Sequence, residues 1–89
     1  MNDYTNPVFD KMIDELNSLV AKLYPWYSPQ VKNVWTILVY DHNEKHLFDI
    51  YSDHYKWYDL NHLIPNEACL IIKEIQDKLL DIEREVFDL

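Results

Sequence analysis

The feature that most limits how this chain can fold is the apolar pattern of its C-terminal segment, residues 66–89. Apolar residues recur there at alternating steps of four and three: Ala68, Ile72, Ile75, Leu79, Ile82, Val86 and Leu89. This spacing is that of one face of an α-helix and fits no other regular structure. Acidic residues recur on the nearly opposite face: Glu74, Asp77, Asp81, Glu85 and Asp88. We therefore predict a helix over 66–87 with one face in the core and a row of carboxylates outside.

A second helix is predicted over residues 7–24. Asn6 and Pro7 form a start signal, because Asn caps free amides and Pro has no N–H to leave unpaired at the first helical position. Apolar residues again step by four and three: Phe9, Ile13, Leu16, Val20 and Leu23. Pro25 disfavours the helical conformation in the residue before it, so the helix is expected to end at residue 24.

Two segments between the helices predict an antiparallel hairpin. Residues 34–40 are rich in β-branched and aromatic side chains and too short for a helix, and residues 46–52 return after the loop 41–45. Asn43 is the expected positive-φ residue of this loop. Residues 25–29 contain two prolines and are expected to be a rigid connector. Residues 53–61 are a candidate short third strand.

These elements predict an α+β fold in the order α-β-β-α, with two helices packed on one face of a hairpin or a small three-stranded sheet. A chain of 89 residues forms a single domain, residues 1–89, around one core. The strand 34–40 is apolar on both faces, so we expect both to be covered. The expected core includes Leu16, Val20, Ile37, Ile50, Ile75 and Leu79.

The charge of the chain favours a basic protein as its partner. Sixteen acidic and eight basic residues give a formal net charge of −8. Such a surface repels nucleic acid and anionic membranes. The lysines are scattered singly in the sequence, so no phosphate-binding patch is expected. The single cysteine fits a reducing compartment, and neither a signal peptide nor a membrane span is recognisable, so we expect a cytoplasmic protein.

No catalytic, metal or cofactor motif is found in the sequence. The chain has no glycine, so a P-loop, a dinucleotide-binding turn and a nucleophile elbow are all excluded. His42 and His46 flank the hairpin loop, but no second pair stands at a metal-ligand spacing, so solvated loop histidines are the favoured interpretation. Cys69 is interpreted as a packing residue. We expect a protein that is not an enzyme and needs no cofactor or metal.

Two kinds of contact surface are predicted. The partner-binding candidates are acidic residues of the final helix and the hairpin loop, together with aromatic residues that follow the hairpin: Glu74, Asp77, Asp81, Glu85, Asp41, Glu44, Tyr55, Trp57 and Tyr58. The aromatic residues would anchor a partner and the carboxylates would speed its approach. Cys69, Leu80 and Phe87 form an apolar ridge beside the seam of the final helix and predict a homodimer contact.

Four parts of the sequence carry a resemblance to a known family. They are Val34–Tyr40, His46–Ser52, the Leu63-Ile64-Pro65 lead into the final helix, and its ending Glu83-Arg84-Glu85-Val86-Phe87. In this pattern the chain resembles the small Maf-type immunity proteins of bacterial polymorphic-toxin systems and, more distantly, immunity proteins of LXG-type toxins. The resemblance implies that the chain binds and neutralises a cognate toxin, such as an EndoU-like RNase. Three alternatives are a phage-type DNA-mimic inhibitor of a defence nuclease, a small structural or adaptor subunit, and a small enzyme that uses the hairpin histidines.

Overall fold

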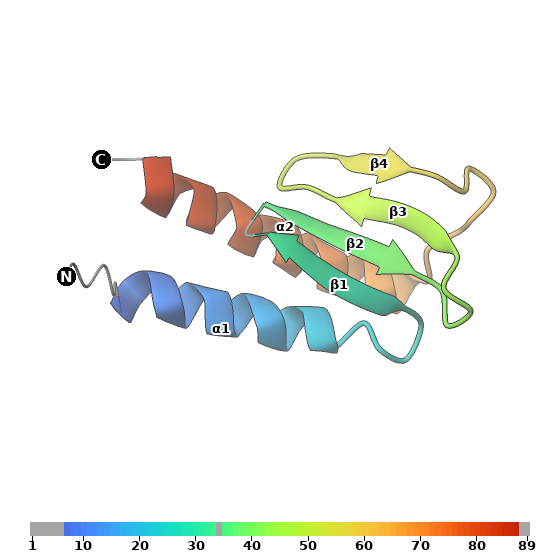
Figure 1. The fold of residues 1–89 in the computed structure, drawn as a ribbon, viewed down its shortest axis with the longest axis horizontal. Helices are drawn as coiled ribbons and strands as arrows, with labels where there is room; N and C mark the ends of the chain where they lie inside the picture. Colours follow the sequence, from blue (N-terminus) through green and yellow to red (C-terminus); the bar gives the residue numbers. More distant parts are fainter. Residues whose placement is uncertain (1–6, 34, 88–89) are drawn as a thin grey trace.

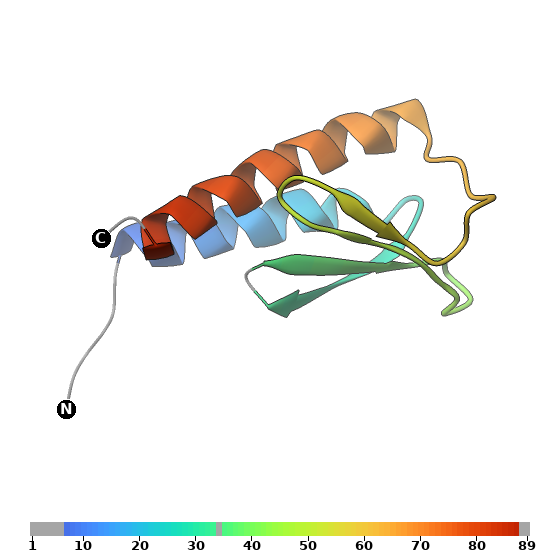
Figure 2. The same ribbon diagram turned by 90° about the horizontal axis from the view of Figure 1, so that it is seen from above.

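A computed structural model of the chain describes residues 7–33 and 35–87 and shows a two-layer α+β fold (Figure 1). The elements follow one another as α1 (Pro7–Ala21), β1 (Ser28–Asn33), β2 (Thr36–Tyr40), β3 (His46–Ile50), β4 (Tyr55–Trp57) and α2 (Asn66–Phe87). The two helices run antiparallel and lie on one side of the sheet (Figure 2). The α+β class is therefore confirmed, but the order is α-β-β-β-β-α.

The sheet has four antiparallel strands in the order β1-β2-β3-β4, so the prediction of two or three strands was wrong. Residues 53–61 do contain a short strand, β4. The strand that the sequence did not indicate is β1, which contains Pro29 of the expected connector. Pro29 is tolerated because β1 is an edge strand, which needs backbone donors only on its β2 side. Pro29 lies opposite Val39 in that pairing.

A register shift in the β2–β3 pairing changes which side chains are buried. Val39 lies opposite Phe48 and Tyr40 opposite His46, so Leu47 is an extra residue in β3. The backbone oxygen of Leu47 accepts hydrogen bonds from the N–H groups of Tyr58 and Asp59, at 2.9 and 3.0 Å. The segment after β4 is thereby anchored over β3, and the four residues 47–50 are all buried. The ring of Tyr58, in this segment, stacks on His46 at the start of β3.

The first helix ends earlier than predicted, at Ala21 instead of residue 24. The next residues form tight turns, in which the N–H groups of Lys22, Leu23 and Tyr24 donate to oxygens three residues back. This tightening follows from Pro25, which disfavours the α conformation in the residue before it. Leu23 is still fully buried.

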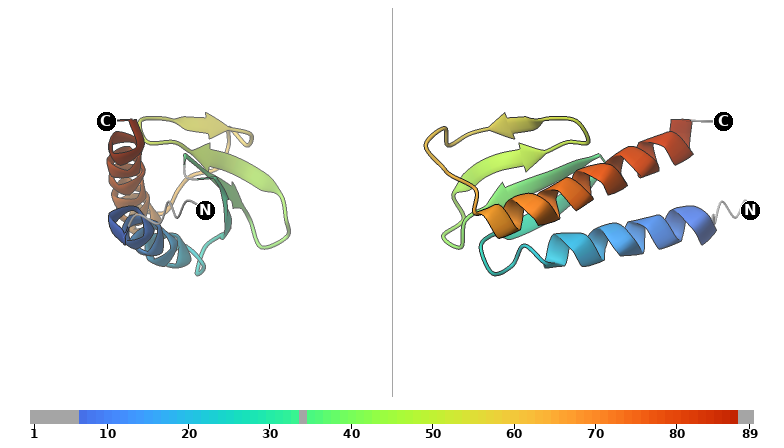
Figure 3. Two further views of the ribbon diagram at one scale, coloured as in Figure 1. Left: turned by 60° about the vertical axis from the view of Figure 1, so that its left-hand side comes forward. Right: turned by 180° about the vertical axis from the view of Figure 1, so that it is seen from behind.

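The core forms where the seams of both helices meet the inner face of the sheet. All six residues expected in the core are buried, and so are five seam residues of α2: Ala68, Ile72, Ile75, Leu79 and Ile82. The helix pair is longer than the sheet, so the α1 N-terminus and the α2 C-terminus extend beyond it (Figures 1 and 3). None of the described helices combines the length and apolarity needed to cross a membrane. The proposed cap Asn6, the strand residue Val34, and Asp88 and Leu89 lie outside the described residues.

Candidate functional site

Three rings form a stack on the face of the sheet that points away from the helices. His46, at the start of β3, lies between Tyr40 of β2 and Tyr58, the residue after β4. The ring centroids of Tyr40 and His46 are 4.5 Å apart, and those of His46 and Tyr58 are 4.0 Å apart. The register brings Tyr40 and His46 together, and the anchoring of Tyr58 on Leu47 adds the third ring. We call these residues the aromatic stack.

A buried carboxylate fixes the central ring of the aromatic stack. Asp49 is only 4% exposed, although it lies on a face where alternation would expose it. Its Oδ1 accepts a hydrogen bond from Nε2 of His46 at 2.6 Å, and its Oδ2 accepts one from the hydroxyl of Tyr58 at 3.4 Å. Since a buried carboxylate must be hydrogen-bonded to avoid a large desolvation cost, Asp49 holds both partners in place. An acidic residue inside an apolar strand is the one signal by which the sequence could have indicated this site.

A groove of about 450 Å³ lies beside the aromatic stack, toward the β1 edge. It is lined by Ser28, Gln30, Tyr40 and Glu44. Ser28 lies opposite Tyr40 in the β1–β2 register, and its small side chain leaves space beside the ring. We call this hollow the Tyr40 groove. Sequence reasoning missed Ser28 because residues 25–29 were expected to be a connector, and it missed Gln30 because no element was predicted for residues 30–33.

The hairpin loop 41–45 supplies one wall of the Tyr40 groove. Its positive-φ residue is Glu44, at 69°, so the prediction of Asn43 was wrong. The N–H of Glu44 donates to the oxygen of Asp41, which closes a turn centred on residues 42 and 43 and leaves the left-handed position to the next residue. The Asp41 carboxylate accepts from the N–H groups of Asn43 and Lys45. Of the two acidic candidates in this loop, Asp41 thus shapes the loop and Glu44 is exposed.

The predicted aromatic anchors do not share one face of the sheet. Tyr55 and Trp57 lie opposite Ile50 and Phe48 in the β3–β4 register, on the inner face. Their rings pack against Phe48, with centroids 5.8 and 5.1 Å away, and burial raises the pKa of Tyr55. Tyr58 lies in the aromatic stack on the outer face and is 48% exposed. Among these three candidates, Tyr58 is the one that belongs to the aromatic stack.

The acidic row of α2 lies on the helix layer, away from the aromatic stack. Glu74, Asp77, Asp81 and Glu85 are all exposed. Within residues 7–33 and 35–87, none of these four carboxylates has an ion-pair partner within 4.0 Å; the pairs present involve Glu15, Asp49, Asp53 and Asp59. The predicted partner-binding residues therefore do not share one surface: the acidic row lies on the helix layer, whereas Asp41, Glu44 and Tyr58 lie on the sheet layer.

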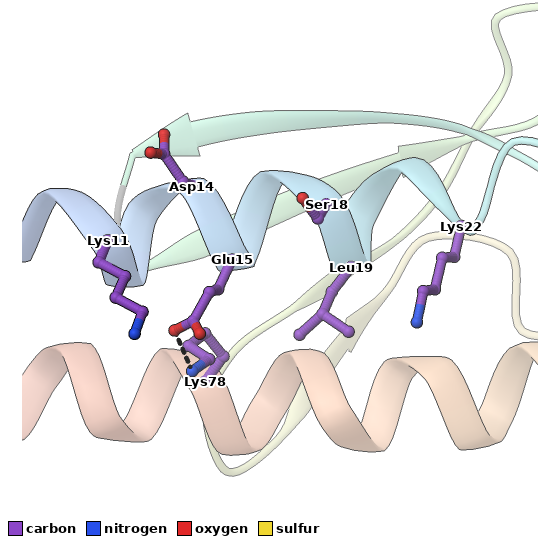
Figure 4. A pocket seen from close by; sticks show the side chains of 7 residues that line it. All are labelled: Lys11, Asp14, Glu15, Ser18, Leu19, Lys22 and Lys78. Atoms are coloured by element: carbon purple, nitrogen blue, oxygen red, sulfur yellow. Dashed lines mark hydrogen bonds and ion pairs between the residues drawn. The ribbon is translucent and has the colours of Figure 1, made fainter.

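A hollow of about 430 Å³ on the helix layer gathers three lysines that are far apart in the sequence: Lys11, Lys22 and Lys78 (Figure 4). The lysines are scattered singly in the sequence, and the packing of α1 against α2 brings these three to one surface. Asp14 and Glu15 line the same hollow, and Lys78 Nζ lies 2.9 Å from Glu15 Oε1. That hydrogen bond lowers the pKa of Glu15. Two carboxylates thus offset most of the positive charge.

The predicted dimer ridge lies on the side of α2 that approaches the turn between β3 and β4. Gln76 marks this side, since its Nε2 donates to the backbone oxygen of Tyr51 at 3.0 Å. Leu80, one turn further along, is half-buried, and Cys69 is exposed. The side chain of Phe87 lies outside the described residues.

The four histidines lie in different surroundings. His62 hydrogen-bonds through Nε2 to the hydroxyl of Tyr27 at 2.5 Å, and His54 stacks on Tyr51 with centroids 4.4 Å apart. His46 belongs to the aromatic stack, and His42 is exposed in the hairpin loop. No three metal-ligating side chains gather at one point anywhere in the part of the chain that the structure describes.

Comparisons of this chain with protein families, with curated proteins and with solved structures find no match.

Proposed function

We propose that this chain is a small inhibitor protein that binds and neutralises a basic protein toxin. The observation that carries the proposal is the acidic row of α2, whose four exposed carboxylates have no ion-pair partner among the described residues. Carboxylates that no cation of their own protein neutralises remain free to pair with a cationic partner. The resemblance to Maf-type immunity proteins supports the same role and suggests an EndoU-like RNase as the toxin.

The length of the acidic row suits docking onto a protein surface that normally binds a polyanion. From Glu74 to Glu85 the helix advances about 16–17 Å, at roughly 1.5 Å per residue. A nuclease must present Lys, Arg or His to successive phosphates, so it is already a receptor for carboxylates arranged along a line. The net charge of −8 would also speed the encounter with such a protein.

The His46–Asp49 pair supports a structural role better than a catalytic one. A catalytic histidine must reach its substrate with one ring nitrogen while a carboxylate orients the other. Both faces of His46 are covered by tyrosine rings, and its side chain is only 27% exposed. We therefore propose a binding protein in preference to a small enzyme.

The test is to co-express the chain with the toxin encoded next to its gene and to measure complex formation and RNase inhibition. Association should slow steeply as salt rises, because exposed charges are screened beyond about 8–10 Å. Asp77→Lys should slow it further. The matched control is Asp53→Lys, the same charge change at a side chain that is 82% exposed on the turn between β3 and β4.

Two results would contradict parts of this proposal. The absence of a complex with any toxin encoded beside the gene would remove the inhibitor role. A complex whose association rate does not depend on salt or on Asp77→Lys would remove capture through the acidic row. A DNA-mimic inhibitor would show the same salt dependence, but with a defence nuclease as the partner.

A further inference from the structure

We propose that the Tyr40 groove binds an arginine side chain of a basic partner protein, with Glu44 pairing with the guanidinium and Tyr40 stacking on it. The inference rests on the proposed function only in taking the partner to be basic. The groove lies on the sheet layer and the acidic row on the helix layer, so the two surfaces can be tested separately.

The groove has an aromatic wall whose position is set before any partner arrives. One face of Tyr40 is covered by His46, with the two ring planes only 21° from parallel. His46 is in turn held by the buried Asp49. On the other side of Tyr40 lies Ser28, which is too small to fill the space. A planar cation can therefore enter beside a ring that needs no reordering, which lowers the entropy cost of binding.

The groove also has a carboxylate that pairs with no cation among the described residues. Glu44 is exposed, and none of the described residues forms an ion pair with it. Its neighbour Lys45 is turned toward Asp59, with Nζ 3.0 Å from Oδ2. Glu44 also occupies a left-handed backbone conformation that a non-glycine residue adopts at a cost of about 1–2 kcal/mol. The turn that closes between Asp41 and Glu44 sets this φ and fixes the backbone of Glu44 beside the groove.

The combination of groups favours arginine over lysine. A guanidinium is planar, so it can stack on the tyrosine ring while its N–H groups make paired hydrogen bonds to a carboxylate. Gln30 and Ser28 line the remaining sides and offer oxygen acceptors for the other N–H groups. An ammonium group would gain the charge attraction but neither the stacking nor the paired geometry.

The first experiment is a titration of the whole chain with N-acetyl-arginine methylamide, followed by NMR of backbone amides and tyrosine rings. We expect saturable shifts at Ser28, Gln30, Tyr40 and Glu44, and weaker binding of the matched lysine compound. Glu44→Gln should weaken binding of the arginine compound about two- to fivefold, which is typical of the loss of an exposed charge pair. Glu67→Gln, the same change at an exposed carboxylate in the first turn of α2 that belongs to neither proposed binding surface, should leave the affinity for the arginine compound unchanged.

A second variant tests the shape of the groove without changing a charge. Ser28→Val should fill the space beside Tyr40 and lower the affinity for the arginine compound, while unfolding measurements show that the protein is still folded. Equal effects of Glu44→Gln and Glu67→Gln, or shifts confined to α2, would overturn the inference. Such a result leaves the proposed function standing, since that depends on the complex with the toxin. Binding of the arginine compound without any toxin complex would support the groove and remove the inhibitor role.

Discussion

His46 Nε2 lies 2.6 Å from Oδ1 of Asp49, three residues further along β3, and this hydrogen bond links the buried part of the sheet to its exposed aromatic stack. The residue after β4, Tyr58, donates to the other oxygen of the same carboxylate. One carboxylate thus joins β3 to the segment that follows β4. Its partners would remain partly buried if it were removed, so its loss should affect both stability and the Tyr40 groove.

Asp49→Ala is expected to lower the free energy of unfolding by about 1–3 kcal/mol, because it leaves the hydrogen-bonding groups of His46 and Tyr58 without their partner. Asp49→Asn should cost less, since the amide oxygen can still accept from one of them. Urea unfolding measures both. Asp53→Ala, at an exposed carboxylate on the next turn, is the control and should lie within about 0.5 kcal/mol of the parent. A similar small effect of Asp49→Ala would contradict the role given to its carboxylate.

Leu79→Ala should lower the free energy of unfolding by about 2–5 kcal/mol, because it removes buried methyl groups and leaves a cavity between α2 and the rest of the core. Leu70 is the matched control on the same helix, since it is 71% exposed whereas Leu79 is fully buried. Leu70→Ala should change stability by less than about 0.5 kcal/mol. Equal costs for the two leucines would show that the buried face of α2 is placed wrongly.

Glu44→Gly should raise the free energy of unfolding by about 0.5–1 kcal/mol, because glycine adopts the positive φ without steric cost. The gain is partly offset by the greater backbone freedom of glycine in the unfolded chain. Asn43→Gly gives that freedom without relieving a positive φ, so it should not stabilise the protein. Thermal unfolding of the two variants measures the difference. The same Glu44→Gly variant should lose affinity for the arginine compound, which separates stability from binding.

The stability of the protein should fall at alkaline pH in a way that depends on Tyr27. Burial raises the pKa of Tyr27 from 10.0 to about 12, so the folded state favours the protonated phenol more than the unfolded state does. The stabilisation is complete below pH 10 and is lost as the pH rises toward 12. Tyr27→Phe should therefore show a smaller loss when unfolding is followed from neutral pH to about pH 11. An equally steep loss of stability in this variant would show that other groups cause the pH dependence. Tyr24→Phe is the control, since it removes one exposed phenol.

The ridge beside the seam of α2 predicts a homodimer. Light scattering at micromolar concentration should give twice the mass of one chain, and Leu80→Glu should reduce it by placing an unpaired charge in the contact. Gln76 and Tyr51 already cover part of this side, so the contact would have to extend from the more exposed end of the ridge, at Cys69. The mass of a single chain at all concentrations would exclude it.

The amino-acid sequence by itself determined the two helices, their buried faces and the α+β class. The reason is that a helix is specified by local periodicity, and the four-three steps of Leu16 and Val20 in α1, or of Ile75 and Leu79 in α2, can be read without knowing the partner. The hairpin of β2 and β3 was predictable for a similar reason, because its residue types and its short loop are close in sequence. The exposure of the acidic row on α2 also follows directly from the helical period.

Only the tertiary structure decided the rest. Whether Pro29 can lie in a strand depends on that strand being at an edge, and whether Glu44 or Asn43 adopts a positive φ depends on where the turn closes. The Tyr40 groove needs Ser28 from one strand and Tyr40 from the next, and the aromatic stack needs a register shift that brings Tyr40 beside His46. These contacts join residues of different strands, so no pattern within one element specifies them. The candidate binding site on the sheet therefore exists only once the four strands have paired.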